Sequence, residues 1–303
     1  MKLLQKIRDI VVGWLAAEVE KPRDLPLADF ERIEYELRPG DVILIEGRTR
    51  ISRVIRLITH SAWSHAALYM GRIHDITDHA MRDHLLKFYN ADPDEQLIIE
   101  SFLGLGIIVA PLTKYKDEHI RICRPKGISR HDVQQVIGYA INKLGQEYDI
   151  RQVFDLARFL LPWAILPRRW LSSLFSYRPS TSIRESCSSL IAEAFQSVDF
   201  PILPVVQRAK DQSMQLVQRS PRLFTPSDFD YSPFFEIIKY PIIELSDAPA
   251  YRKLPWNKEG LLSDIEGKVY TPLGEKKLEP AKEETLEKDK KDEEPPKVFE
   301  FFD

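Results

Sequence analysis

Residues 186–195 read SCSSLIAEAF and carry the clearest structural pattern in the chain. Their apolar side chains recur at helical spacing and, together with the cysteine, form one stripe: Cys187, Leu190, Ile191, Ala194, Phe195 and Val198. This stripe predicts a helix that packs against a sheet, with the Cys187 thiol on its first turn. A helix N-terminus favours a thiolate, and its free N–H groups can stabilise an oxyanion. The alternative is a small buried apolar residue, the commonest role of a free cysteine.

Several strands precede this helix in the chain. Short apolar runs bounded by turn residues predict strands at 41–46, 64–70, 97–101, 106–110 and 119–124, and helical spacing predicts helices at 51–58 and 129–144. Strands gathered early and helices gathered late indicate an α+β fold rather than alternating βαβ units.

Two of these strands carry polar side chains that suit catalysis. His65, the second residue of SHAALYM (64–70), is interpreted as a mid-strand residue that shares a face with Trp63, Ala67 and Tyr69, so it is either a core histidine or a base. Glu100 ends the apolar run of a neighbouring strand, where a carboxylate is costly unless it is paired or marks an exposed strand end. With Cys187, these residues supply the nucleophile, base and orienting carboxylate of a thiol hydrolase.

Six motifs occur in one order along the chain: RPGDVILIEG (38–47), SHAALYMG (64–71), LIIES (97–101), GQEYD (145–149), SCSSLIAEAF (186–195) and TPSDFDYSPFF (225–235). This series resembles the circularly permuted papain-like cysteine amidase/peptidase group, the YiiX-like branch of the NlpC superfamily, related to lecithin:retinol acyltransferase. The resemblance implies a small antiparallel sheet packed against the cysteine helix, with helical insertions. It also implies Cys187 as nucleophile, His65 as base and Glu100 as the orienting residue.

The expected activity is cleavage of an amide, ester or thioester bond through an acyl-enzyme on Cys187. Alternatives are a lipid acyltransferase of the same chemistry and a non-enzymatic, membrane-peripheral module that binds a lipid or a peptide. The side chains expected to contact the acyl, lipid or peptide substrate are Tyr69, Trp63, Ser186, Ser188 and Trp163.

Two insertions interrupt the motifs, at 72–96 and 151–183, and both are candidate lids. Within the second, residues 153–177 are rich in apolar and aromatic side chains beside the basic pair Arg168–Arg169. Such a segment either lies in a lipid interface or buries its own surface. The amphipathic helix predicted for residues 1–20 has two matching alternatives, a membrane surface or docking on its own domain.

The predicted organisation is an N-terminal helix (1–28), a catalytic domain (29–245), an extension (246–274) and a disordered, highly charged tail (275–303). The tail ends in the apolar tip VFEFFD, residues 298–303, which either docks on a partner protein or has no role.

Composition excludes several classes of function. The formal net charge of −3 argues against a nucleic-acid binder, and two cysteines, of which Cys123 is interpreted as a packing residue, suit a reducing compartment. No apolar run approaches the roughly 20 residues that span a bilayer, and no signal peptide is recognised, so we expect a cytoplasmic protein with at most peripheral membrane contact. His74, His79 and His84 do not share a helix face, and no phosphate-binding glycine motif occurs, so neither metal nor cofactor is expected.

Overall fold

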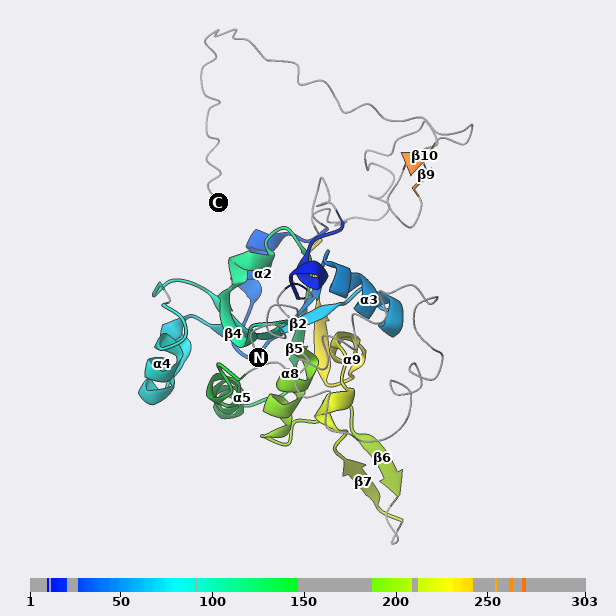
Figure 1. The fold of residues 1–303 in the computed structure, drawn as a ribbon. Helices are drawn as coiled ribbons and strands as arrows, with labels where there is room; N and C mark the ends of the chain where they lie inside the picture. The colour runs from blue at the N-terminus through cyan, green and yellow to red at the C-terminus, as the bar shows by residue number, and fades with distance from the viewer. Residues whose placement is uncertain are drawn as a thin grey trace, which may run out of the picture. The chain divides into compact units, whose positions relative to one another are not determined.

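The computed structural model describes residues 10, 12–20, 27–90, 92–146, 187–208, 212–241, 254, 262–263 and 269–270 (Figure 1). The chain divides into two compact units, Met1–Glu244 and Leu245–Asp303. In the second unit, the described elements are β9 (Leu262–Ser263) and β10 (Val269–Tyr270), which pair antiparallel. The predicted charged tail and its apolar tip lie outside the described residues.

A six-stranded sheet organises the first unit. Its strands are β1 (Val42–Glu46), β2 (His65–Gly71), β3 (Leu97–Phe102), β4 (Gly106–Pro111), β5 (His119–Pro125) and β8 (Phe235–Ile238). They lie in the order β4-β3-β2-β1-β5-β8, and every neighbouring pair is antiparallel. The predicted α+β fold with an antiparallel sheet is therefore confirmed, and β8 adds an edge strand that the periodicity analysis did not identify.

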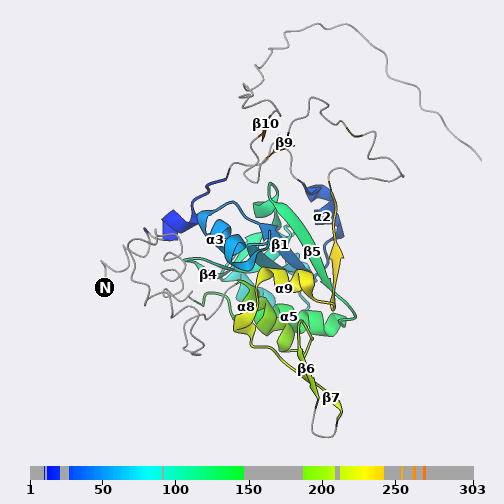
Figure 2. The ribbon, with the colours of Figure 1, turned by 90° about the vertical axis from the view of Figure 1, so that its right-hand side faces the viewer.

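Helices cover both faces of this sheet. α5 (Arg130–Asn142) and α8 (Cys187–Gln196) pack on one face, and α2 (Phe30–Glu36) covers the other (Figure 2). The strands therefore bury side chains on both sides: Val42 and Leu44 of β1 belong to the α5–α8 core, whereas Ile43 belongs to the α2 core. This explains why the central strands are continuous apolar runs.

Polar caps set where the helices begin. Ser129 caps α5 by accepting a hydrogen bond from the Asp132 N–H at 3.0 Å. Thr49 caps α3 (Arg50–Thr59) in the same way, accepting from the Ser52 N–H at 3.2 Å. A capping box at Thr225 opens α9 (Pro226–Tyr231).

The first insertion and the segment before α9 add further elements. The insertion folds into the 3₁₀ turn η1 (Ile73–Asp75) and helix α4 (His79–Leu86). Ahead of α9 lie a hairpin of β6 (Val205–Arg208) and β7 (Met214–Val217) and the 3₁₀ turn η4 (Pro221–Leu223).

The described part of the N-terminal segment docks on its own domain. Residues 12–16 are helical, and Leu15 is fully buried. Arg50 holds the segment by donating from its backbone N–H to the Ala17 carbonyl at 3.1 Å and from its guanidinium to the Trp14 carbonyl at 3.0 Å. Residues 14–20 therefore match the alternative in which this segment docks on its own domain. Residues 1–9 lie outside the part of the chain that the structure describes.

Candidate active site

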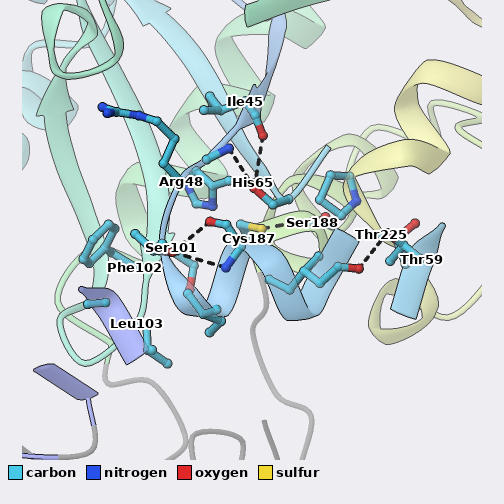
Figure 3. Close-up of a pocket in the computed structure, with 18 of the residues that line it drawn as sticks. Ile45, Arg48, Thr59, His65, Ser101, Phe102, Leu103, Cys187, Ser188 and Thr225 are labelled. Carbon is cyan, nitrogen blue, oxygen red and sulfur yellow. Dashed lines mark hydrogen bonds between the residues drawn. The ribbon is translucent and has the colours of Figure 1, made fainter. Parts of the chain in front are cut away.

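The candidate site lies where α8 and β2 both begin. Cys187 is the first residue of α8, so its thiol is at the helix N-terminus, as the stripe analysis predicts. His65 is the first residue of β2, so the expectation that it lies in the middle of a strand is wrong. Ser64, just before the strand, accepts the Gly47 N–H at 2.9 Å and closes the turn into it. Figure 3 shows the His65 ring and the Cys187 sulfur in the same pocket.

The His65 ring lies between the thiol and a carboxylate. Leu68 of β2 stands opposite Ile99 of β3, so these two side chains share a sheet face. Because side chains alternate along each strand, His65 and Glu100 both lie on the other face. The His65 Nε2 atom lies 2.5 Å from Glu100 Oε2. The imidazole also interacts with the Cys187 thiol, because each of the two groups shifts the pKa of the other. The three side chains singled out from the sequence therefore come together in one site.

Two residues that sequence reasoning missed hold the carboxylate. Glu100 is fully buried, and its Oε1 atom accepts from Lys114 Nζ at 2.5 Å while Oε2 accepts from the Tyr115 hydroxyl at 2.5 Å. Both partners come from η2 (Leu112–Tyr115), the 3₁₀ turn that follows β4. The sequence does contain a signal for them. Lys114 and Tyr115 follow the strand that pairs with the Glu100 strand, and a buried carboxylate requires a cation or hydrogen-bond donors nearby.

The electrostatics favour a charged pair. Burial disfavours the imidazolium, but the charge and hydrogen bond of Cys187, followed by those of Glu100, outweigh it and raise the pKa of His65 to about 10. Burial also disfavours the carboxylate, yet His65 and then Lys114 lower the pKa of Glu100 to about 2. The directions of these shifts favour an imidazolium between a thiolate and a carboxylate.

The Cys187 thiolate has stabilising neighbours besides the imidazolium. Burial opposes its ionisation, but His65 lowers its pKa below the usual thiol range, with smaller contributions from the Ala66 backbone N–H and the Ser188 hydroxyl. Ser188 Oγ lies 3.9 Å from the sulfur. The thiolate is the reactive form of cysteine, so a lowered pKa favours nucleophilic attack by this sulfur.

A pocket of about 600 Å³ opens beside the sulfur. His65, Cys187 and Ser188 line it together with residues from α3, the end of β3 and the start of α9 (Figure 3). Its volume falls within the roughly 300–1,000 Å³ of small-molecule sites. The site therefore has room for a substrate next to the reactive pair.

The other expected substrate contacts are distributed differently. Tyr69 lies in the α2 core and donates to Gln96 Oε1 at 2.7 Å, and Trp63 packs in the opposite core, stacked on His119. Neither Tyr69 nor Trp63 lines this pocket. The two side chains also do not share a sheet face, as the strand pattern predicted, because β2 begins only after Trp63. Ser186 and Trp163 lie outside the described residues.

The first insertion is not a lid over this pocket. None of its described residues lines the pocket, and its apolar side chains Ile76 and Leu85 are buried in the α5–α8 core. The insertion was interpreted as a lid because it lengthens the gap between two site strands, but its apolar positions are used for packing. The second insertion, 151–183, lies outside the described residues.

Within the described ranges, no group of three or more histidine, cysteine or acidic side chains is placed to hold a metal ion. Among the same residues, no helix is both long and apolar enough to cross a bilayer.

Comparisons with known proteins add a family and a structural neighbour. Residues 36–157 match the family model described as permuted papain-like amidase enzyme, YaeF/YiiX, C92 family. The match includes His65 and Glu100 and ends before Cys187. A crystal structure titled metalloprotein yiiX, from Escherichia coli O157:H7, is similar over 67% of this chain and 97% of that chain, with 15% identity and a TM-score of 0.39. No curated protein matches the chain.

Proposed function

We propose that the chain is a permuted papain-like amidase of the YiiX-like group, whose family model matches residues 36–157, and that it cleaves amide bonds through an acyl-enzyme on Cys187. The matched family is described as permuted papain-like amidases, which supports a cysteine hydrolase in general. The observation that supports the specific residues is the His65 ring, which hydrogen-bonds the buried Glu100 carboxylate and lines the same pocket as the Cys187 thiol. Nucleophile, base and orienting group in one row are the requirements of this chemistry.

In the proposed reaction, the Cys187 thiolate attacks the scissile carbonyl carbon and forms a carbon–sulfur bond. The carbonyl oxygen becomes an oxyanion, for which free N–H groups at the start of α8 are available. The His65 imidazolium gives its proton to the leaving amine as the carbon–nitrogen bond breaks. Neutral His65 then takes a proton from water, the hydroxide attacks the thioester, and the carboxylic acid leaves while the thiolate–imidazolium pair is restored.

Glu100 acts in this scheme through His65. Its hydrogen bond to Nε2 turns Nδ1 toward the sulfur and stabilises the positive ring. Lys114 and Tyr115 hold the carboxylate in place and compensate for its burial. We assign Glu100 as a positioning residue and expect its loss to matter less than the loss of His65.

The test is intact-mass analysis after incubation with a reactive acyl compound, such as a p-nitrophenyl ester. We expect an acyl adduct on Cys187 that is absent in Cys187→Ser and retained in the matched variant Cys123→Ser. Labelling that persists in Cys187→Ser, or that shifts to Cys123, contradicts the assignment. Tight ligand binding that survives Cys187→Ala, with no turnover of any acyl substrate, favours the non-enzymatic binding module.

Acyl transfer is the second candidate, because an amine or alcohol can replace water in the second step. The apolar surface of the pocket, formed in part by isoleucines of α3, favours it by limiting contact with water. Product analysis with and without an added amine or alcohol acceptor separates the two outcomes. Acylated acceptor as the main product favours transfer, whereas free acid in its presence favours hydrolysis.

A further inference from the structure

We propose that the pocket binds an unbranched acyl chain along α3, which makes the substrate of the proposed reaction a fatty-acyl amide or ester. This inference rests on the proposed function, because it assigns the acyl part of the substrate to one wall of the same site. It starts from three isoleucines of α3, Ile51, Ile55 and Ile58, all of which line the pocket that contains Cys187.

The isoleucines form a continuous apolar track. They recur at i, i+4 and i+7, so they lie on one helix face. At 1.5 Å per residue the track is roughly 10 Å long, longer than any single aliphatic amino-acid side chain. Ile51 and Ile55 are only half-buried and Ile58 is 45% exposed, in contrast to Val54 of the same helix, which is buried. Their free surface therefore belongs to the pocket.

Apolar side chains from other elements also line the pocket. Phe102 and Leu103 come from the end of β3 and the turn after it, and Phe224 and Pro226 come from the start of α9. A ligand among these groups removes apolar surface from water, which is the main favourable term for binding a hydrocarbon chain.

Several polar groups of the pocket are bonded within the protein, although Arg48 Nη1 is buried without a hydrogen-bond partner among the described residues. Arg48 Nε donates to Glu118 at 3.0 Å, the Thr49 and Ser52 hydroxyls are 2.8 Å apart, and the Thr59 hydroxyl donates to the Ile55 carbonyl at 2.8 Å. A peptide chain needs hydrogen-bonding partners for its backbone, whereas a hydrocarbon chain needs none. An acyl chain that ends at the Cys187 sulfur therefore suits this lining better than a peptide.

The experiment compares p-nitrophenyl acetate with p-nitrophenyl octanoate in the full-length protein. We expect kcat/KM to be roughly 100-fold higher for octanoate, because each methylene that leaves water contributes up to about fourfold. Ile55→Asn should lower this ratio by roughly tenfold, and Ile55→Leu should largely keep it. Equal rates for the two wild-type substrates, or an unchanged ratio in a folded Ile55→Asn variant, overturn the proposal.

A matched control is Leu57→Asn on the same helix. Leu57 is 73% exposed and does not line the pocket, so the ratio should stay at the wild-type value. If the octanoate-to-acetate ratio of kcat/KM falls equally in Leu57→Asn and Ile55→Asn, the change comes from a general effect on α3. That result contradicts an acyl-chain site along the three isoleucines.

A binding measurement with a fluorescent fatty acid distinguishes failure of this inference from failure of the proposed function. We expect the Cys187→Ala variant to bind dansylundecanoic acid, with an affinity that falls roughly tenfold when Ile55→Asn is added. Wild-type protein that hydrolyses no ester refutes the proposed function, yet Ile55-dependent binding still supports the chain site. Binding that ignores Ile55, or no binding, refutes the chain site.

The same acyl chemistry occurs in water-soluble compounds and in lipid bilayers. A final arm presents p-nitrophenyl laurate either in solution or within phosphatidylcholine vesicles. Faster turnover in vesicles assigns the acyl group to a membrane lipid, and faster turnover in solution assigns it to a soluble acyl compound.

Discussion

The surroundings of the two cysteines show what makes a thiol reactive in this protein. Cys123 lies in β5 opposite Val42, is fully buried in the α5–α8 core, and has its pKa raised far above the usual thiol range, mainly by burial. Burial acts on Cys187 in the same direction, but the His65 charge reverses the outcome. Burial alone therefore yields an inert thiol, and a neighbouring imidazolium at a helix start yields a nucleophile.

Selective alkylation is the largest expected difference between the two thiols. At pH 7, iodoacetamide should modify Cys187 far faster than Cys123, because the pKa of one thiol is lowered and that of the other is raised, and alkylation requires the thiolate. Peptide mass mapping over time measures both rates. The Cys187 rate should fall only as the pH drops through its lowered pKa, below the usual thiol range. Comparable rates at the two sites in folded protein contradict the comparison.

Removing the imidazole should make Cys187 resemble Cys123. We expect His65→Ala to lower kcat/KM by about 10²–10⁴-fold and to raise the pKa of the Cys187 thiol, because the charge that offsets burial is gone. Steady-state kinetics and the pH dependence of alkylation measure the two effects. His131→Ala, an exposed substitution on α5, serves as the control and should leave both unchanged.

Removing the carboxylate should weaken the pair without abolishing it. We expect Glu100→Gln to lower kcat/KM by about 10–100-fold. Wild-type activity should decline as the pH rises through about 10, where His65 loses its proton, and this limb should move to lower pH in Glu100→Gln because Glu100 helps raise the pKa of His65. If the alkaline decline of activity occurs at the same pH in Glu100→Gln as in wild type, Glu100 does not affect the pKa of His65, and its assignment as a positioning residue is wrong.

The same substitution has a stability signature whose sign follows from the pKa of Glu100. Its folded pKa of about 2 lies below the usual value of 4.5, so its stabilisation is fully present above pH 4.5 and is lost as the pH falls toward 2. Glu100→Gln should therefore cost about 3 kcal/mol at pH 7, with a smaller difference from wild type in acid. Urea unfolding at pH 7 and pH 3 measures this trend.

The smallest effect is expected at the inert thiol. Cys123→Ala should lower the free energy of unfolding by about 1 kcal/mol, because it removes packed atoms from the core and no charge or hydrogen bond of the site. Thermal unfolding and the ester assay measure stability and activity. A loss of activity comparable to that of His65→Ala refutes the distinction between the two thiols.

Sequence periodicity predicted the local elements well and the contacts between elements only in part. Strands at 97–101 and 106–110 lie within one residue of β3 and β4, because alternation and apolar runs reflect neighbours a few positions apart. Trp63 was assigned to the His65 face because the strand alternation was continued to Trp63, whereas β2 begins at His65. That boundary depends on the Ser64 hydrogen bonds to another segment, which no local pattern records.

Residue patterns indicated the α+β character, placed Cys187 on the first turn of an apolar-striped helix, and singled out His65 and Glu100. The family resemblance added the antiparallel sheet and the roles of the three residues. Only the tertiary structure decided that the His65 ring joins the thiol to the carboxylate, that Lys114 and Tyr115 hold Glu100, and that the α3 isoleucines line the pocket. The reason is physical: helices and strands arise from short-range spacing, whereas the charge, burial and hydrogen bonds of a reactive thiol arise from segments that only packing brings together.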